Sequence, residues 1–272
     1  MKKLIWYISD FFTTMKKHHV EMYAAASAFF IFICIIPFLT ILMYFIPYTP
    51  LDKNILNELA KTLFPDIAYS LSFSLIDEIY NRTNAILPLS IITMLWTASK
   101  TMVSVRNGLN DINGIEEKKN FLIVRLIASL YTFLAIIMIV LISFISLFGE
   151  RIHELLSIHN IRILNYILVI IDYRVLITII GFFLTFLFFY AFLPAKNIAI
   201  KKVIPGALFS SLACQLFSRI FTFLINNYLS FSMYGSLATI VVIMMYFNFF
   251  FYFFFLGAYL NRYLFRRNDN AL

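Results

Sequence analysis

Residues 203–228 read VIPGALFSSLACQLFSRIFTFLINNY, a stretch that is long enough to cross a bilayer and yet contains an arginine. On a helix that turns by about 100° per residue, its polar residues fall within a wedge of about 100°. These residues are Ser211, Gln215, Ser218, Arg219, Thr222 and Asn226. Hydrocarbon offers such groups no hydrogen-bond partners, so we expect the stripe to face other helices or a water-filled cavity.

The composition indicates a membrane protein. Of the 272 residues, 62% are hydrophobic and 13% are charged, whereas a soluble domain carries about a quarter charged residues. We therefore predict one all-α transmembrane domain over residues 1–272. Cys34 and Cys214 lie in apolar runs without metal-ligand company, so we expect no metal site, no disulfide and no cofactor.

Apolar runs predict six transmembrane helices, placed at residues 23–48, 85–105, 121–148, 174–193, 203–228 and 235–263. Residues 1–20 have the apolar spacing of an amphipathic helix in the cytoplasmic interface, or alternatively of a helix packed on the bundle. Residues 51–84 are predicted to form an outer amphipathic helical segment. Residues 106–120 and 149–173 contain charge and are interpreted as polar connections.

Several prolines and glycines are expected to bend the helices or to let them pack closely. Pro37 removes a hydrogen-bond donor inside the first span and predicts a kink there. Pro205 stands near a helix start, where a missing donor costs little. The full set is Pro37, Pro205, Gly206, Gly235 and Gly257.

A second polar stripe lies on the predicted helix at residues 85–105. Within about 120° of one another on a helical wheel lie Ser90, Thr93, Thr97, Lys100, Thr101, Ser104 and Asn107. The alternative is that this helix leaves the membrane near Trp96, with the Lys100 ammonium at the head groups.

The distribution of positive charge predicts the orientation. Most of the 22 lysines and arginines fall at the N-terminus, at the C-terminus or in the connections near residues 100–125 and 196–202. Cytoplasmic segments carry such an excess, so six spans with both termini in the cytoplasm are favoured. The basic residues are spread over loops and the aromatic residues lie in the spans, so we expect no nucleic-acid partner.

Four segments resemble the YihY/BrkB family of bacterial inner-membrane proteins. They are AAASAFFIFICIIPF at residues 24–38, LWTASKTMVSVRNGLNDINGIEEKKNFLIVRL at 95–126, FLPAKNIAIKKVIPGAL at 192–208 and MYGSLATIVVIMMYFNFFFYFFFLGAYLN at 233–261. The resemblance implies a bacterial inner-membrane location and six spans with both termini inside. Members have been labelled virulence factors and, by an old naming, ribonuclease BN, and some are linked to export or flipping of envelope lipids.

One position departs from the family pattern. Many relatives have a glutamate in a GAELN-like segment, where this chain has Tyr259 in GAYLN. If that carboxylate couples protons or ions in relatives, this chain must do so by other means or not at all.

The residues do not favour an enzyme. Phosphodiester hydrolysis needs a metal cage of carboxylates and histidines, or a paired acid and base. No acidic residue falls within the six predicted spans, and no histidine stands near the adjacent acids Glu116 and Glu117. We therefore predict neither nuclease activity nor another enzymatic activity.

Arg219 is the most informative single residue. It lies about 24 Å along the helix from Val203, in the outer third of a hydrocarbon core about 30 Å thick. It could snorkel to the outer head groups or pair with Asp172 or Glu150. Alternatively, it lies in a polar cavity and binds an anionic group such as a lipid phosphate, which suits the guanidinium fork.

Together the two stripes predict a hydrophilic groove between the second and fifth spans, with Lys100 near its inner mouth and Arg219 near its outer mouth. The hypothesis is a flippase-like transporter of a phospholipid or an anionic glycolipid, whose head group passes along the groove. The alternatives are a transporter of a small solute or anion, and a scaffold for envelope assembly that transports nothing. The sixth span is a candidate face for a homo-oligomer.

Overall fold

The computed structural model describes residues 15, 17–45, 86–157, 173–228 and 235–269, and every regular element among them is a helix. In chain order the helices are α2 (Val20–Phe45), α5 (Ile86–Asn113), α6 (Phe121–Ser157), α8 (Tyr173–Phe192), α9 (Ile200–Tyr228) and α10 (Gly235–Asp269). The prediction of an all-α chain is confirmed for these residues.

The chain divides into two compact units. The larger unit comprises residues 1–29 and 99–272, and the smaller unit comprises residues 30–98. The boundaries fall inside α2, between Phe29 and Phe30, and inside α5, between Ala98 and Ser99. Both helices therefore contribute one part to each unit.

Four helical stretches in the described residues are long and apolar enough to cross a membrane. They are Val20–Phe38, Phe121–Ile142, Ile200–Ile225 and Ile240–Phe265. A shorter apolar stretch, Leu176–Phe192, lies in α8. α5 is long but carries Lys100, Arg106 and Asp111, which lower its hydropathy. Six spans with both termini in the cytoplasm stay a prediction.

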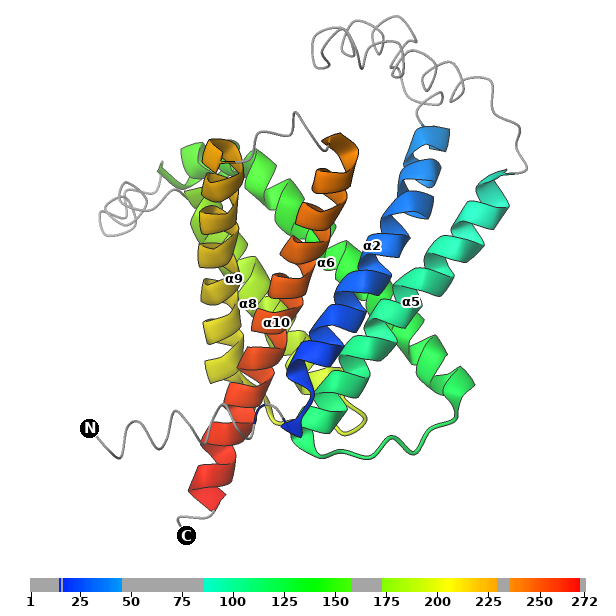
Figure 1. Cartoon of the computed structure of the whole chain (residues 1–272). Coiled ribbons are helices and arrows are strands. Elements are labelled where there is room, and N and C mark those ends of the chain that lie inside the picture. The colour runs from blue at the N-terminus through cyan, green and yellow to red at the C-terminus, as the bar shows by residue number, and fades with distance from the viewer. Residues whose placement is uncertain (1–14, 16, 46–85, 158–172, 229–234, 270–272) are drawn as a thin grey trace, which may run out of the picture. The chain divides into compact units, whose positions relative to one another are not determined.

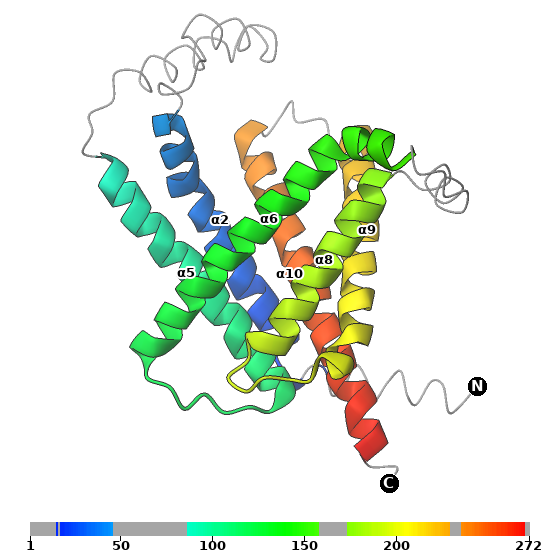
Figure 2. The same cartoon turned by 180° about the vertical axis from the view of Figure 1, so that it is seen from behind.

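Within the larger unit, α9 packs against α10 and α8, and α8 packs against α6 (Figures 1 and 2). Aromatic rings pack between these helices: Phe186 of α8 meets Phe254 of α10 edge-on at 5.3 Å between centroids, and Phe217 of α9 lies 5.2 Å from Phe249 of α10. The opposite side of α6 is apolar and exposed; Leu126, for example, is 72% exposed. A face of that kind fits lipid.

The backbones of α9 and α10 come closest at two glycines. A Cβ atom at Gly206 would overlap the carbonyl oxygen of Gly257, and one at Gly257 would overlap the Ser210 hydroxyl. Small residues permit close contact in membrane bundles, where packing rather than the hydrophobic effect drives association. Pro205 lies inside α9 next to this crossing, and Pro37 lies inside α2 in the smaller unit.

Three helices continue past the residues that were predicted to cross the membrane. α5 continues through residues 106–113, α6 continues to Ser157 and α10 continues to Asp269, beyond the predicted ends at 105, 148 and 263. Charge alone does not end a helix, because arginine, glutamate and lysine are good helix formers. α5 ends only at Gly114, whose φ of 65° breaks the helical path.

The two predicted amphipathic segments lie almost entirely outside the described residues. Of residues 1–20 the structure describes 15 and 17–20, and of residues 51–84 it describes none. A turn precedes α2, in which the His18 N–H donates to the Met15 carbonyl and His19 has a φ of 47°. This turn separates α2 from the residues before it.

Candidate functional site

The polar stripe of α9 divides between a buried and an exposed side. Ser211 is buried and its hydroxyl bonds the Leu208 carbonyl of its own helix at 2.9 Å. The Ser218 hydroxyl lies 2.6 Å from the Tyr246 hydroxyl of α10. These two serines therefore face protein, and Gln215 is half-buried beside them.

Arg219 and Thr222 lie on the exposed side of the stripe. Together with Ser218, Phe223 and Asn227 they line an open depression of about 480 Å³. The side chain of Asn226 and the two candidate ion-pair partners, Asp172 and Glu150, are not among the described side chains. The structure thus places the arginine in a hollow that also offers neutral hydrogen-bonding groups.

The second polar stripe begins in the smaller unit. There Thr93 is exposed and donates to the Leu89 carbonyl, while Thr97 is buried and donates to the Thr93 carbonyl, each at 2.8 Å. Such bonds satisfy the hydroxyls within their own helix. Lys100 lies in the larger unit and is half-buried. A groove between the second and fifth predicted spans would involve both units and stays a prediction.

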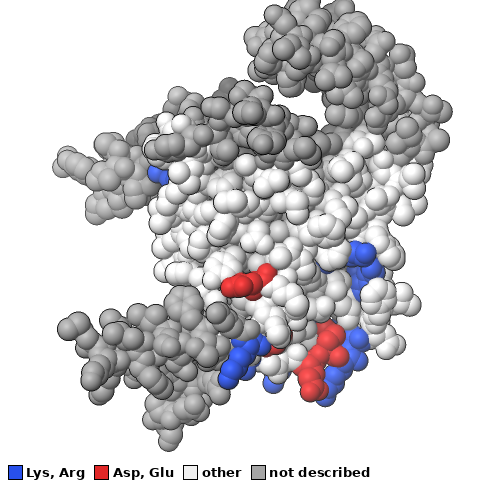
Figure 3. Space-filling model, in the orientation of Figure 1, with Lys and Arg blue, Asp and Glu red and all other residues white. Residues whose placement is uncertain are grey.

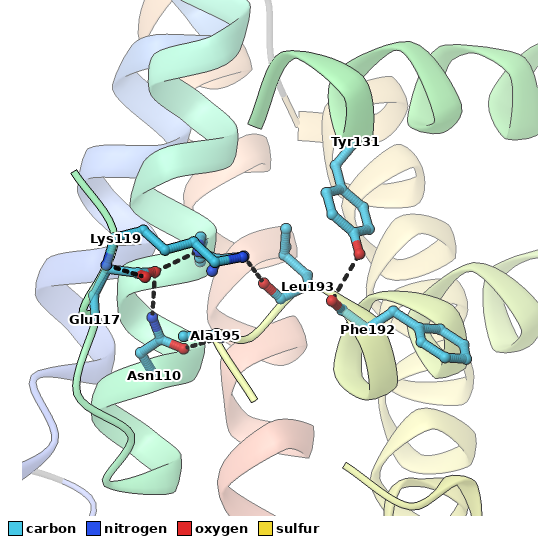
Figure 4. Close-up of polar contacts among 8 residues, drawn as sticks. Asn110, Glu117, Lys119, Tyr131, Phe192, Leu193 and Ala195 are labelled. Atoms are coloured by element: carbon cyan, nitrogen blue, oxygen red, sulfur yellow. Dashed lines mark hydrogen bonds and ion pairs between the residues drawn. The ribbon is translucent and has the colours of Figure 1, made fainter. Parts of the chain in front are cut away.

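A buried arginine joins three segments of the larger unit (Figure 4). Arg106 of α5 is 2% exposed, and its Nε lies 2.7 Å from Oε2 of Glu117 in the loop after α5. Its Nη1 donates to the Leu193 carbonyl at 2.6 Å. Asn110 completes the contact: its Nδ2 donates to Glu117 at 3.4 Å, and its Oδ1 accepts from the Ala195 N–H at 2.8 Å.

The same contacts set the charge state of Glu117. Burial raises the pKa of this carboxyl, but the hydrogen bond from Arg106, the Lys119 N–H and the two positive charges outweigh burial. The pKa of Glu117 therefore lies below its ordinary value. Arg106 and Glu117 form a charged pair, and further hydrogen bonds join this pair and Asn110 to backbone groups of Leu193, Ala195 and Lys119. The network therefore holds the end of α5 against the link between α8 and α9.

A second arginine caps α5. The Gly114 N–H donates to the Asp111 carbonyl and the Ile115 N–H to the Asn110 carbonyl, which is the Schellman pattern of a helix C-terminus. Arg262 of α10 donates to the carbonyls of Ile112 and Asp111. A cation here also complements the negative end of the helix dipole.

Asn261 connects α10 to the first turns of α9. Its Oδ1 accepts from the Gly206 N–H at 2.6 Å and its Nδ2 donates to the Val203 carbonyl at 3.2 Å. Nearby, the buried Tyr190 hydroxyl of α8 donates to the Phe254 carbonyl at 2.5 Å and lies 2.9 Å from the Ser210 hydroxyl. Three helices are thus tied together by buried polar groups.

Beside these contacts lies a cavity of about 510 Å³, which we call the α9–α10 cavity. Its wall is formed by Leu109, Asn113, Tyr190, Ile198, Lys202, Val203, Ala258, Asn261, Arg262 and Phe265. It adjoins a more open hollow of about 820 Å³ lined by residues 113–119, 195–199 and Lys202. Figure 3 shows most of the visible charged side chains in the lower half of the view, toward the end where α10 finishes, with a separate basic patch at the upper left.

Sequence reasoning missed this end of the bundle. Residues 106–120 were interpreted as a connection, so Arg106, Asn110 and Glu117 were not recognised as partners. The helical wheel gave no signal for Arg106, because it lies about 140° from Thr101 and outside the polar stripe. Its partner Leu193 is 87 residues away. The sequence uses Lys202 and Arg262 only as part of the positive charge that predicts the orientation of the chain. It does not place them in a cavity.

Among the described residues, no group of three or more His, Cys, Asp or Glu side chains could hold a metal ion. Tyr259 is buried, and its ring lies 5.9 Å from that of His18. Tyr259 therefore packs against the turn before α2.

Comparison with known proteins places the chain among membrane proteins. A protein of Bacillus subtilis (strain 168) described as "Putative ribonuclease-like protein YfkH" is 26% identical over 263 residues, which cover 96% of each chain. No solved structure matches. The profile of the family described as "Virulence factor BrkB" matches residues 11–272. With its long apolar helices, this chain belongs to the BrkB family of multi-pass membrane proteins.

Proposed function

We propose that this protein resides in the bacterial inner membrane with both termini in the cytoplasm, and that it moves an anionic envelope lipid between the leaflets. The observation that carries this proposal is the exposed guanidinium of Arg219 on a helix that is long and apolar enough to span the bilayer. A charge at that depth is costly unless an opposite charge or water accompanies it.

The surroundings of Arg219 suit an amphiphilic anion. The depression beside it offers Ser218, Thr222 and Asn227 as hydrogen-bonding neighbours. Farther round α9, Leu216 is 62% exposed and Ile220 is 50% exposed. A phosphate could therefore bind the guanidinium by two parallel hydrogen bonds while the acyl chains lie against the apolar side of α9.

The second polar stripe supplies the other wall in this proposal. Thr93, Thr97 and Lys100 would line the path opposite Ser211, Gln215, Arg219 and Asn226. The hydroxyls of Thr93 and Thr97 already donate to carbonyls of their own helix, so they would bind a head group only weakly. Weak, neutral contacts of this kind would let the head group move along the path.

The test is lipid movement in reconstituted vesicles that contain labelled phosphatidylglycerol. Arg219→Ala should abolish movement and leave the fold intact, because an exposed side chain is removed. Arg219→Lys should retain partial activity, since it keeps the charge and loses the fork. Leu130→Ala is the control, because it removes an exposed, uncharged side chain from another helix, α6. Full activity of Arg219→Ala would remove this residue from the mechanism.

Two other functions would give different results in the same vesicles. A transporter of a small anion would move labelled inorganic phosphate and leave the lipid where it is. A scaffold would move neither, and deletion of residues 51–84 would then impair envelope assembly more than any change at Arg219.

We propose no enzymatic activity for this chain. The purified protein should leave RNA intact during prolonged incubation with Mg²⁺ or Mn²⁺. Cleavage that persists through a second purification step and is lost on substitution of Glu116 or Glu117 would overturn this expectation.

A further inference from the structure

The α9–α10 cavity has the size of a ligand site. Its volume of about 510 Å³ falls within the range of about 300–1,000 Å³ that is typical of small-molecule pockets. Parts of α5, α8, α9 and α10 form its wall, all within the larger unit. Lys202, which lines the cavity, and Arg219 both lie on α9, but toward opposite ends of this helix.

The wall of the cavity is positively charged. Lys202 and Arg262 both line it, and none of the described lining residues is acidic. Two acids in nearby segments have partners of their own: the Glu117 carboxylate pairs with Arg106, and the Asp111 carboxylate lies 3.5 Å from His18 Nδ1. The adjoining hollow is lined by Lys118, Lys119 and Lys196 and also by Glu116 and Glu117, so with Lys202 its lysines outnumber its acids. An anion is the ligand that this field favours.

The two cations are held in place by their surroundings. Arg262 donates to two carbonyls at the end of α5, so its guanidinium is fixed to the wall. The Lys202 ammonium lies 5.6 Å from the centroid of the Phe265 ring, a cation–π contact that leaves the ammonium at the mouth. Positive groups held before the ligand arrives lose less entropy on binding.

The remainder of the wall is apolar. Leu109, Val203, Ala258 and Phe265 provide hydrocarbon surface beside the charges. A ligand with an anionic group and an apolar portion matches both parts of this wall. A free inorganic anion would leave the apolar surface uncovered.

We infer that the α9–α10 cavity binds the phosphate group of an amphiphilic ligand, with Lys202 as its direct contact. This inference rests on the proposed function, because it assigns the uptake site at the predicted cytoplasmic face for the same class of substrate. Lys202 and Arg219 lie 17 positions apart, or about 26 Å along α9, close to the thickness of a hydrocarbon core of about 30 Å. One helix thus presents a cation for a head group near each leaflet.

Adjacent lysines allow a matched test. Lys201 and Lys202 are both exposed, but only Lys202 lines the cavity. The full-length protein in phosphatidylcholine nanodiscs is titrated by calorimetry with dioctanoyl phosphatidylglycerol and, separately, with inorganic phosphate. Lys202→Gln should weaken lipid binding about tenfold, as expected for one charge-assisted hydrogen bond, and Lys201→Gln should bind like the unaltered protein. Lys202→Arg should restore binding.

The outcomes separate this inference from the proposed function. Equal weakening by Lys201→Gln and Lys202→Gln would mean general attraction to a basic surface and would overturn the inference. Inorganic phosphate that binds as tightly as the lipid, with the same dependence on Lys202, would overturn the amphiphilic ligand. Unaltered lipid binding in Lys202→Gln, with movement lost in Arg219→Ala, would overturn the inference alone. Normal movement in Arg219→Ala, with Lys202-dependent binding intact, would overturn the proposed function and leave a binding site.

Discussion

The Arg106 guanidinium and the Glu117 carboxylate lie 2.7 Å apart, and Arg106 is almost entirely buried. The same guanidinium donates to the Leu193 carbonyl, so one side chain connects α5, the loop that follows it and the link between α8 and α9. Pairs of this kind add little when compared with an apolar replacement, but breaking them by removing one partner is costly. The pair therefore controls whether this end of the bundle is held together.

Arg106→Ala should destabilise the protein by about 3 kcal/mol, because it leaves a partly buried carboxylate and the Leu193 carbonyl without their donor. The measurement is thermal unfolding in detergent, followed by circular dichroism. Arg125→Ala is the control, since Arg125 is half-buried and its guanidinium lies 5.7 Å over the Phe121 ring. A loss in Arg125→Ala as large as in Arg106→Ala would contradict the role given to the pair.

Stability should fall as the solution becomes acidic. The pKa of Glu117 is below its ordinary value of 4.5 in the folded protein, so the folded state binds its proton more weakly than the unfolded state. This contribution is fully present above pH 4.5 and is lost as the pH falls through the folded pKa. Glu117→Gln should be less stable than the unaltered protein near neutral pH, and the difference should shrink below pH 4.5. A difference that grows on acidification would contradict the assignment.

Asn261→Ala should cost about 1–3 kcal/mol of stability, because it leaves the buried Gly206 N–H and Val203 carbonyl without their side-chain partners. Asn227→Ala is the comparison, since Asn227 is exposed and its side chain donates to the Phe223 carbonyl of its own helix. Unfolding in increasing denaturant measures both. Similar midpoints for the two variants would show that Asn261 does not hold α9 to α10.

Gly257→Ala should disrupt the crossing of α9 and α10, since the new methyl group would overlap the Ser210 hydroxyl and approach the Gly206 carbonyl at 2.5 Å. Overpacking of this kind costs about 1–3 kcal/mol, and more where backbone is the obstacle. Protease sensitivity in native membranes provides the measurement. Leu264→Ala, at an exposed position of α10, should resist protease like the unaltered protein. Resistance of Gly257→Ala would mean that the helices do not cross at these glycines.

Hydropathy and helical periodicity were sufficient for the class of fold and for the positions of the helices. The run at 203–228 corresponds closely to α9, and the run at 174–193 to α8. These segments are continuous and apolar, so each can be recognised from neighbouring residues alone. Helix ends were harder, because Arg106 and Asn110 continue α5 through bonds to residues that a local pattern does not include.

The candidate site was only partly accessible to sequence reasoning. The wheel placed Ser211 and Arg219 in one stripe, but the structure buries the serine and exposes the arginine, because the stripe lies at the edge of the contact with α8 and α10. A helical wheel gives the direction of each side chain around its own helix, but it does not show which of those directions a neighbouring helix covers. The cavity beside Lys202 combines residues from four helices, and no single segment carries its signature.

The cap on α5 has a consequence for how the chain is made. Arg262 donates to Ile112, which lies 150 positions earlier, and Asn261 joins α9 across 55 positions. During synthesis the ribosome must therefore add a further 150 residues before the Ile112 carbonyl meets its donor. Until α10 has been synthesised, the end of α5 lacks its cap from Arg262, so a helix made early is completed by one made much later.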